Sequence, residues 1–322
     1  MARFAWRLLM ALAVPGLAFA HGGVDAAKRS VEGSMLVTGE IAVNPDGGVY
    51  GYSLDHRDKL PPAVVNLIDQ TLTGWKFTPV KVNGKPELAK AFMSLRIVAK
   101  QIDAKHDAIS VESAAFGAET TQAHKTSDCA NVASVANGAC LTYLTRRPPD
   151  YPRNLINDLV SGTVYLVLEV DRQGRVAQVA VEQVDLREIA DGATLGRWRR
   201  ELGDVSLAAA RKWTFQVPQA GSGEGWNHWI VFVPVNYAID VFGQKKKIGE
   251  PDYGQWDAYV PGPVNSIPWL QEQRGQIASN GNADAIPDDG TPFIADTRFV
   301  LLTPISGDGA AKSSPAANPG QG

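Results

Sequence analysis

The chain has 322 residues, of which 44% are hydrophobic and 20% are charged, and its formal net charge is −3 at pH 7. This length is enough for two modest cores and rules out a minimal domain, and the composition disfavours both wholesale disorder and a helical membrane bundle. A nearly neutral chain also lacks the basic field that nucleic-acid binding needs, so we expect no nucleic-acid partner.

Residues 1–20 have the pattern of a signal peptide. Arg3 and Arg7 precede an apolar stretch, and Ala18-Phe19-Ala20 places small residues where signal peptidase cleaves. A proline and a glycine interrupt the stretch, which is shorter than the roughly 20 apolar residues of a membrane-spanning helix. We therefore predict export with cleavage after Ala20. The alternative is a retained anchor, and membrane contact is expected only in that case.

A first unit is predicted at residues 33–100. An alternating strand at 39–49 runs into a turn at Gly47, where a hairpin needs a residue that tolerates positive φ. The apolar residues of Pro62–Thr73 fall on one helical face, which predicts an amphipathic helix. The helix runs into Gly74-Trp75-Lys76-Phe77-Thr78-Pro79, and a closing strand is predicted at Ala91–Val98.

A second unit, at residues 146–243, repeats this order. A strand and its turn occupy 164–176, with Gly174 in the turn, and a helix around Leu207–Lys212 leads into Trp213-Thr214-Phe215. A closing strand is predicted at Trp229–Ile239. Each unit therefore reads strand, strand, helix, strand. The predicted fold class is α+β, with two tandem antiparallel sheets that each carry a helix on one face.

Two further segments are expected to hold little regular structure. Residues 101–145 are rich in Ala, Ser, Thr and Asn and are predicted to be a linker, in which Cys129 and Cys140 form a disulfide if the chain folds in an oxidising compartment. Residues 244–322 are predicted to be an irregular, Pro/Gly-rich extension with a disordered end. Between residues 249 and 310 it holds nine acidic residues and two arginines, a net charge of −7.

Several motifs of the second unit occur together in an order that resembles the C-terminal domain of the TonB energy-transducer family. They are Pro149-Asp150-Tyr151-Pro152-Arg153, then Gly162-Thr163-Val164, the Gly174 turn and Lys212-Trp213-Thr214-Phe215. The first unit resembles the same domain in a degenerate form. The resemblance implies a periplasmic module that binds a protein or peptide, such as an outer-membrane transporter, by adding an extended segment to a sheet edge.

The final strand of the second unit is the expected binding edge, and Pro234 within it marks an outward-facing position or blocks pairing there. The segment before Tyr151 is the other expected contact. The predicted binding residues are Arg146, Arg147, Tyr151, Trp229, Val231, Val233 and Tyr237.

The motifs of common enzymes and metal sites are missing from the sequence. We therefore predict no catalytic residues, no metal and no cofactor. Two alternatives stay open: a membrane-anchored energy transducer that keeps its leader, and a metal-binding or hydrolytic periplasmic protein that uses the acidic extension. Neither the partner's identity nor the oligomeric state follows from these patterns.

Overall fold

A computed structural model describes residues 31–101, 107–117, 141–217, 228–239, 252–273, 279–280, 283–287, 290, 292–295 and 298–305. The predicted leader, Cys129 and Cys140 lie outside these residues. Within the described part of the chain, no helix has the length and apolar character needed to cross a membrane.

The first unit is an antiparallel sheet covered by one helix. Its elements are β1 (Glu32–Val43), β2 (Val49–Leu54), the 3-10 helix η1 (Arg57–Lys59), α2 (Pro62–Thr73), β3 (Lys81–Val82), β4 (Lys85–Pro86), β5 (Ala89–Gln101) and β6 (Asp107–Gly117). β1 pairs with β2 at one edge and with β5 at the other, and β6 pairs with β5. β3 and β4 form a separate small hairpin.

The second unit follows the same plan. Its elements are β7 (Thr142–Thr145), the 3-10 helix η4 (Arg153–Leu155), β8 (Gly162–Asp171), β9 (Val176–Leu186), α4 (Gly192–Ala210), β10 (Thr214–Gln216) and β11 (His228–Tyr237). β8 lies between β9 and β11, all antiparallel, and β10 pairs with β7. The α+β class and the antiparallel sheets predicted from the sequence are confirmed.

The helix of the first unit buries the apolar face that the sequence pattern predicted, whereas the helix of the second unit is longer than predicted. In α2, Val64, Ile68 and Leu72 are fully buried against the first sheet. α4 begins much earlier than the predicted Leu207, because the Asp191 carboxylate caps the helix by accepting hydrogen bonds from the amides of Ala193 and Thr194. α4 has 19 residues against 12 in α2, so the helix of the second unit is about two turns longer.

One turn contact is the same in both units. Gly47 and Gly174 have φ of 82° and 75°, and a Cβ there would lie 2.1 Å from the Phe77 carbonyl oxygen and 1.8 Å from that of Phe215. The amides of these phenylalanines donate to the carbonyls of the same two glycines, at 2.8 and 2.7 Å. Only glycine fits both turns, and in each it joins the hairpin to the chain that follows the helix.

The predicted linker at 101–145 is wrong in two places. Residues 107–117 form β6, which pairs along its length with β5, and residues 142–145 form β7. The alanines and serines of β6 have low strand propensity, which concealed it. Val111, Ala114 and Phe116 are nevertheless buried against the core under α2, and pairing with β5 satisfies the backbone.

The described parts of the extension after residue 244 form a few short elements that are packed into the fold. β12 (Asp257–Tyr259) pairs with β1, and β13 (Ser279–Asn280) pairs with β6. The short helices α5 (Pro268–Gln273) and η5 (Ala283–Ala285) lie in the same region of the chain. Phe299 and Leu301 are buried in the core of the first unit, and Leu301 forms a bridge with Phe77.

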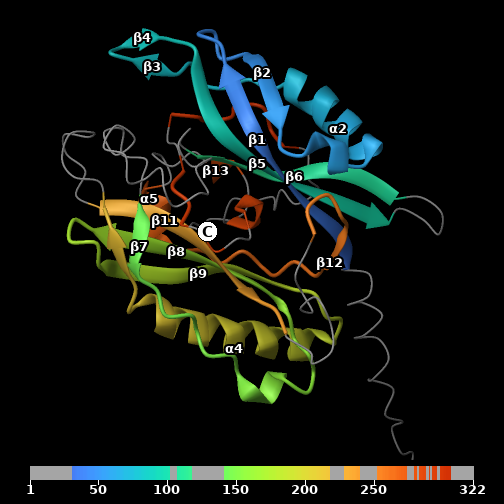
Figure 1. Cartoon of the computed structure of the whole chain (residues 1–322), viewed down its shortest axis with the longest axis vertical. Coiled ribbons are helices and arrows are strands. Elements are labelled where there is room, and N and C mark those ends of the chain that lie inside the picture. Colours follow the sequence, from blue (N-terminus) through green and yellow to red (C-terminus); the bar gives the residue numbers. More distant parts are fainter. Residues whose placement is uncertain are drawn as a thin grey trace, which may run out of the picture.

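The molecule is layered. Figure 1 shows α2 and α4 on the two outer faces, a sheet beneath each, and segments of the extension between the sheets. A separate apolar cluster fills this middle layer, where Phe92 of the first sheet and Tyr165, Val167 and Phe232 of the second meet Phe293 of the extension. The two units therefore pack against each other through residues of the extension.

Candidate functional site

The expected binding edge is the outer edge of β11. β8 pairs with β11 along its whole length on one side. On the other side, Phe232 forms a bridge with Phe293 of the extension: each amide donates to the other's carbonyl oxygen at 2.8 Å. Phe293 is itself buried, with its ring 6.3 Å from that of Phe92. This edge therefore accepts an additional extended segment, and in this structure the segment comes from the same chain.

The alternation of a strand determines which residues of β11 are open to pairing. Because the backbone of Phe232 points outward to Phe293, the backbones of Ile230 and Pro234 also point outward. Those of Val231 and Val233 point to β8. Pro234 thus occupies an outward-facing position, where its missing N–H leaves the pairing with β8 intact.

The burial of four residues of β11 corrects the expectation that their side chains contact a partner. The side chains of Trp229, Val231, Val233 and Tyr237 all lie in the core between the second sheet and α4. In a strand, neighbouring residues direct their side chains to opposite faces and their backbone N–H and C=O groups to opposite edges. These four residues therefore alternate with those whose backbones point to the open edge. The Tyr237 hydroxyl lies 2.6 Å from that of Ser206, and burial raises the pKa of Tyr237 to about 12. These four side chains are structural.

The residues before the second sheet have three different environments. Arg146 packs over the ring of Tyr143, with its guanidinium carbon 4.9 Å from the ring centroid. Arg147 is largely exposed and lies 3.9 Å from Asp150. The Tyr151 hydroxyl donates to the carbonyl oxygen of Val160 at 2.8 Å, and burial, followed by nearby Glu188, raises its pKa to about 12. The ring of Tyr151 lies beside that of Tyr237 of β11, with centroids 6.1 Å apart, and Arg146 lines a cavity that Asn236 of β11 also lines.

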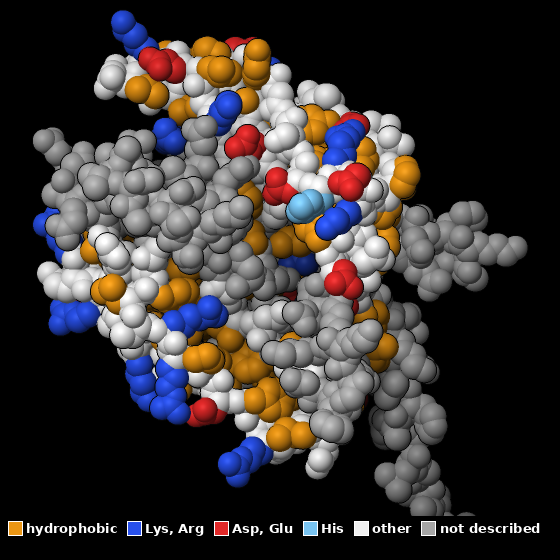
Figure 2. All heavy atoms as spheres, viewed as in Figure 1, with side chains coloured by type: hydrophobic (Ala, Val, Ile, Leu, Met, Phe, Trp, Pro, Cys, Tyr) orange, Lys and Arg blue, Asp and Glu red, His pale blue; other side chains and the backbone are white. Residues whose placement is uncertain are grey.

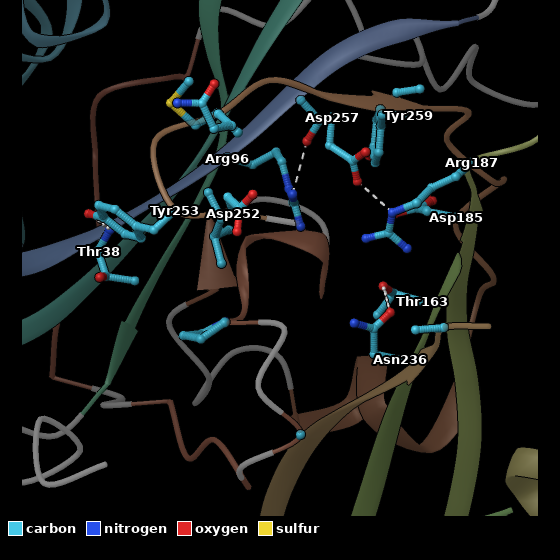
Figure 3. A pocket seen from close by; sticks show the side chains of 18 of the residues that line it. Thr38, Arg96, Thr163, Asp185, Arg187, Asn236, Asp252, Tyr253, Asp257 and Tyr259 are labelled. Atoms are coloured by element: carbon cyan, nitrogen blue, oxygen red, sulfur yellow. Dashed lines mark hydrogen bonds and ion pairs between the residues drawn. The ribbon is translucent and has the colours of Figure 1, made fainter. Parts of the chain in front are cut away.

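A cavity of about 890 Å³ lies between the two units, and we call it the inter-unit cavity. Its lining carries charges of both signs. Figure 3 shows Arg96 of β5 and Arg187, which follows β9, extending into it, with Asp257 bound to Arg187 at 2.5 Å. On the face seen in Figure 2, acidic and basic side chains lie close to one another around a recess between the upper and lower halves.

A buried polar cluster forms one wall of this cavity. The Arg96 guanidinium donates to the Ser34 hydroxyl at 2.9 Å, to the Tyr165 hydroxyl at 2.8 Å and to the Asp284 carbonyl oxygen at 2.8 Å. The Asp284 carboxylate in turn accepts hydrogen bonds from Ser113, at 2.7 Å, and from Tyr259. The cluster joins the first sheet, the second sheet and the extension.

Asp185 is buried and also lines this cavity. One carboxylate oxygen accepts from the side chain of Gln183 and from the Gly262 amide, both at 2.8 Å, whereas Oδ2 is buried without a hydrogen-bond partner. Burial, followed by the neighbouring charge of Asp284, raises the pKa of Asp185 to about 7. Ionising a carboxyl group in this position costs free energy unless a cation lies close enough to compensate the negative charge.

Sequence reasoning missed Phe293, Arg96 and Asp284. Two local signals were available: Arg96 stands between apolar neighbours in a strand, and Phe293 lies in a short apolar run within a polar segment. The partners of these residues are not local, since Arg96 and Asp284 are 188 residues apart. Within the described ranges, no three metal-ligating side chains gather into a group that could hold an ion.

The described residues form two β-β-α-β units, and at the outer edge of β11 a single bridge joins Phe232 to Phe293 of the extension. Comparison with known proteins finds 31% identity over 93 residues to Protein TonB of Xanthomonas campestris pv. campestris, in strain B100 and equally in strain ATCC 33913. The match covers 29% of this chain and 35% of each relative, so the chain spans about a third of the length of the curated relatives it matches. No family model and no solved structure matches significantly. The chain therefore contains a TonB-like region.

Proposed function

We propose that this protein is a periplasmic, TonB-like interaction module linked to outer-membrane transport, and that a partner adds an extended segment to the outer edge of β11. The similarity to TonB favours a transport-related role without catalysis. The observation that carries the proposal is the pair of reciprocal hydrogen bonds between Phe232 and Phe293, because residues of the extension already pair with this strand edge.

The present occupant of the edge is short. Phe293 supplies one bridge to β11, and Ala295, two residues further on, bridges to Gly117 at the end of β6. Residues 292–295 therefore join the two units with few backbone hydrogen bonds. A partner with a longer extended segment would make more of these bonds along β11, each with a net value of about 1 kcal/mol, and would displace Phe293.

The register of such a partner is limited by Pro234. Ile230 and Phe232 offer both a donor and an acceptor to the outer edge, whereas Pro234 offers only its carbonyl oxygen. The partner's hydrogen bonds should therefore concentrate on the first half of β11. For the same reason, proline at Val231 would break pairing with β8 and would not test the edge.

The test compares two substitutions at one edge position. Ile230→Pro removes an outward donor, and Ile230→Ala is the matched control, since it shortens the side chain but keeps the N–H. Affinity would be measured for synthetic peptides that cover the periplasmic N-terminal segments of outer-membrane transporters from the same cell. We expect Ile230→Pro to bind about tenfold more weakly than Ile230→Ala, because one hydrogen bond is lost and the added strand is distorted. Equal affinity of the two variants would contradict pairing at this edge.

We further propose that residues 33–100 and 146–243 are tandem copies of one domain. In support, the two units share element order, strand order and the glycine turn contact. The signal peptide, the Cys129–Cys140 disulfide and the alternative of a leader-anchored transducer depend on residues outside the described ranges and stay predictions.

A further inference from the structure

The inter-unit cavity borders a gap in a sheet edge. On the side of β1 away from β5, β12 pairs with Glu32–Ser34 and β2 pairs with Gly39–Val43. The residues between them, among them Met35, Leu36 and Thr38, line the cavity. The gap is thus one short stretch of strand edge, closed at both ends by neighbouring strands.

Leu36 presents its backbone to this gap. The Thr38 carbonyl oxygen accepts from the Asp55 amide at 2.9 Å, and the Thr38 amide donates to the Tyr253 hydroxyl at 3.3 Å, so Thr38 faces away from β5. By strand alternation Leu36 faces the same way. None of the described strands pairs with Leu36 on that side.

The chain turns away where it would have filled the gap. Continuing the register of β12 would place Gln255 opposite Leu36, but the Gln255 amide bonds to the Asp252 carbonyl oxygen at 3.1 Å, and Gly254 has a φ of 80°. This turn leads the chain off β1. The N–H and C=O of Leu36 are therefore open to hydrogen bonds from another molecule. A peptide unit supplies both the carbonyl oxygen and the N–H that they need.

Charges of both signs surround the same space. Arg187 and Asp257 project into it as an ion pair, and their side chains are 13% and 32% exposed. Asp185, which is buried and lacks a partner at Oδ2, lines the cavity beside them. A cavity with this mixture does not select a simple anion or cation, whereas a molecule with an ammonium and a carboxylate finds an opposite charge for each.

We propose that the inter-unit cavity binds a short extended peptide with free termini, which pairs with the backbone of Leu36 and places its ammonium near Asp185 and its carboxylate near Arg187. The volume of about 890 Å³ lies within the roughly 300–1,000 Å³ of typical ligand sites. Asn236 at the end of β11 also lines this cavity, but the pairing position at Leu36 lies on β1. The inference therefore goes beyond the proposed pairing at Ile230 and Phe232 and does not depend on it.

The test is titration calorimetry on the full chain at pH 8, above the pKa of Asp185. The probe is tetraalanine with free termini, compared with its N-acetylated form, its C-amidated form, free alanine and inorganic phosphate. We expect tetraalanine to bind and each capped form to bind at least about tenfold more weakly, because each cap removes one charge pairing. No binding of tetraalanine at millimolar concentration, or phosphate binding as tight as that of tetraalanine, would overturn the proposal.

Two variants and one direct measurement complete the test. Asp185→Asn keeps the shape of the side chain. It should weaken the binding of uncapped tetraalanine at least about tenfold and leave the affinity for the N-acetylated form unchanged. Arg175→Gln, which removes an exposed ion pair with Asp171, is the control and should not change affinity. If Asp185→Asn does not fold, amide exchange on the unmodified chain decides: tetraalanine should slow exchange at Leu36. Protection at Phe232 with none at Leu36 would refute the site and point to the β11 edge.

Discussion

Replacement of Phe293 by alanine should release the extension from the β11 edge while the second sheet stays folded. Phe293 is about 5% exposed, and its ring packs in the middle layer beside Phe92 and Phe232. Truncating a buried phenylalanine usually costs roughly 3–5 kcal/mol. Because residues 292–295 are held by few backbone hydrogen bonds, we expect this loss to appear first as local detachment rather than as global unfolding.

Residue-resolved amide exchange measures this directly. The Phe232 amide donates to the Phe293 carbonyl oxygen, so its exchange should accelerate by about 100-fold for a loss of about 3 kcal/mol. The amides of Val231 and Val233 face β8 and should keep their protection. Leu302→Ala, at a position of the extension that is 60% exposed, is the control and should change none of the three. Unchanged protection at Phe232, or equal acceleration at all three amides, would refute the reasoning.

Three more predictions concern stability and processing. The pKa of Asp185 is raised in the folded state, so the folded protein binds this proton more tightly than the unfolded chain does. The free energy of unfolding should therefore fall as pH rises from about 4 to about 7, by at most roughly 4 kcal/mol. In urea unfolding, the Asp185→Asn variant should lack this decrease. Gly174→Ala should destabilise by at least about 2 kcal/mol in the same assay, because its Cβ would collide with the Phe215 carbonyl, whereas Gly51→Ala, with open space around it, should not. The intact mass of the native protein should lack residues 1–20, and a full-length mass in the membrane fraction would instead favour the retained anchor.

Much of each unit could be predicted from local patterns. Alternation with a period of two indicated the strands, apolar residues on one helical face indicated α2, and Gly47 and Gly174 marked the turns. Pro234 was recognised as either an outward-facing or a blocking position. These features depend on a few neighbouring residues. Because strands, helices and turns have fixed backbone geometries, they leave repeating patterns that can be recognised in the sequence.

The candidate site was predicted less well for a related reason. β11 is covered on both faces, by α4 on one side and by the middle layer around Phe232 on the other, and its nearly continuous apolar run does not reveal this cover. Trp229, Val231, Val233 and Tyr237 were therefore selected although all four are buried under α4. Likewise, β6 is hidden by its alanines and serines, whose place in the sheet depends on pairing with β5.

The sequence by itself determined the two units, their antiparallel strands and their covering helices, since these follow from short-range periodicity. Only the tertiary structure decided that the extension runs between the units, that Phe293 occupies the β11 edge, and that Arg96 meets Asp284 across 188 residues of chain. The physical reason is that such contacts depend on loop closure and on packing summed over the whole molecule, neither of which leaves a local pattern along the chain.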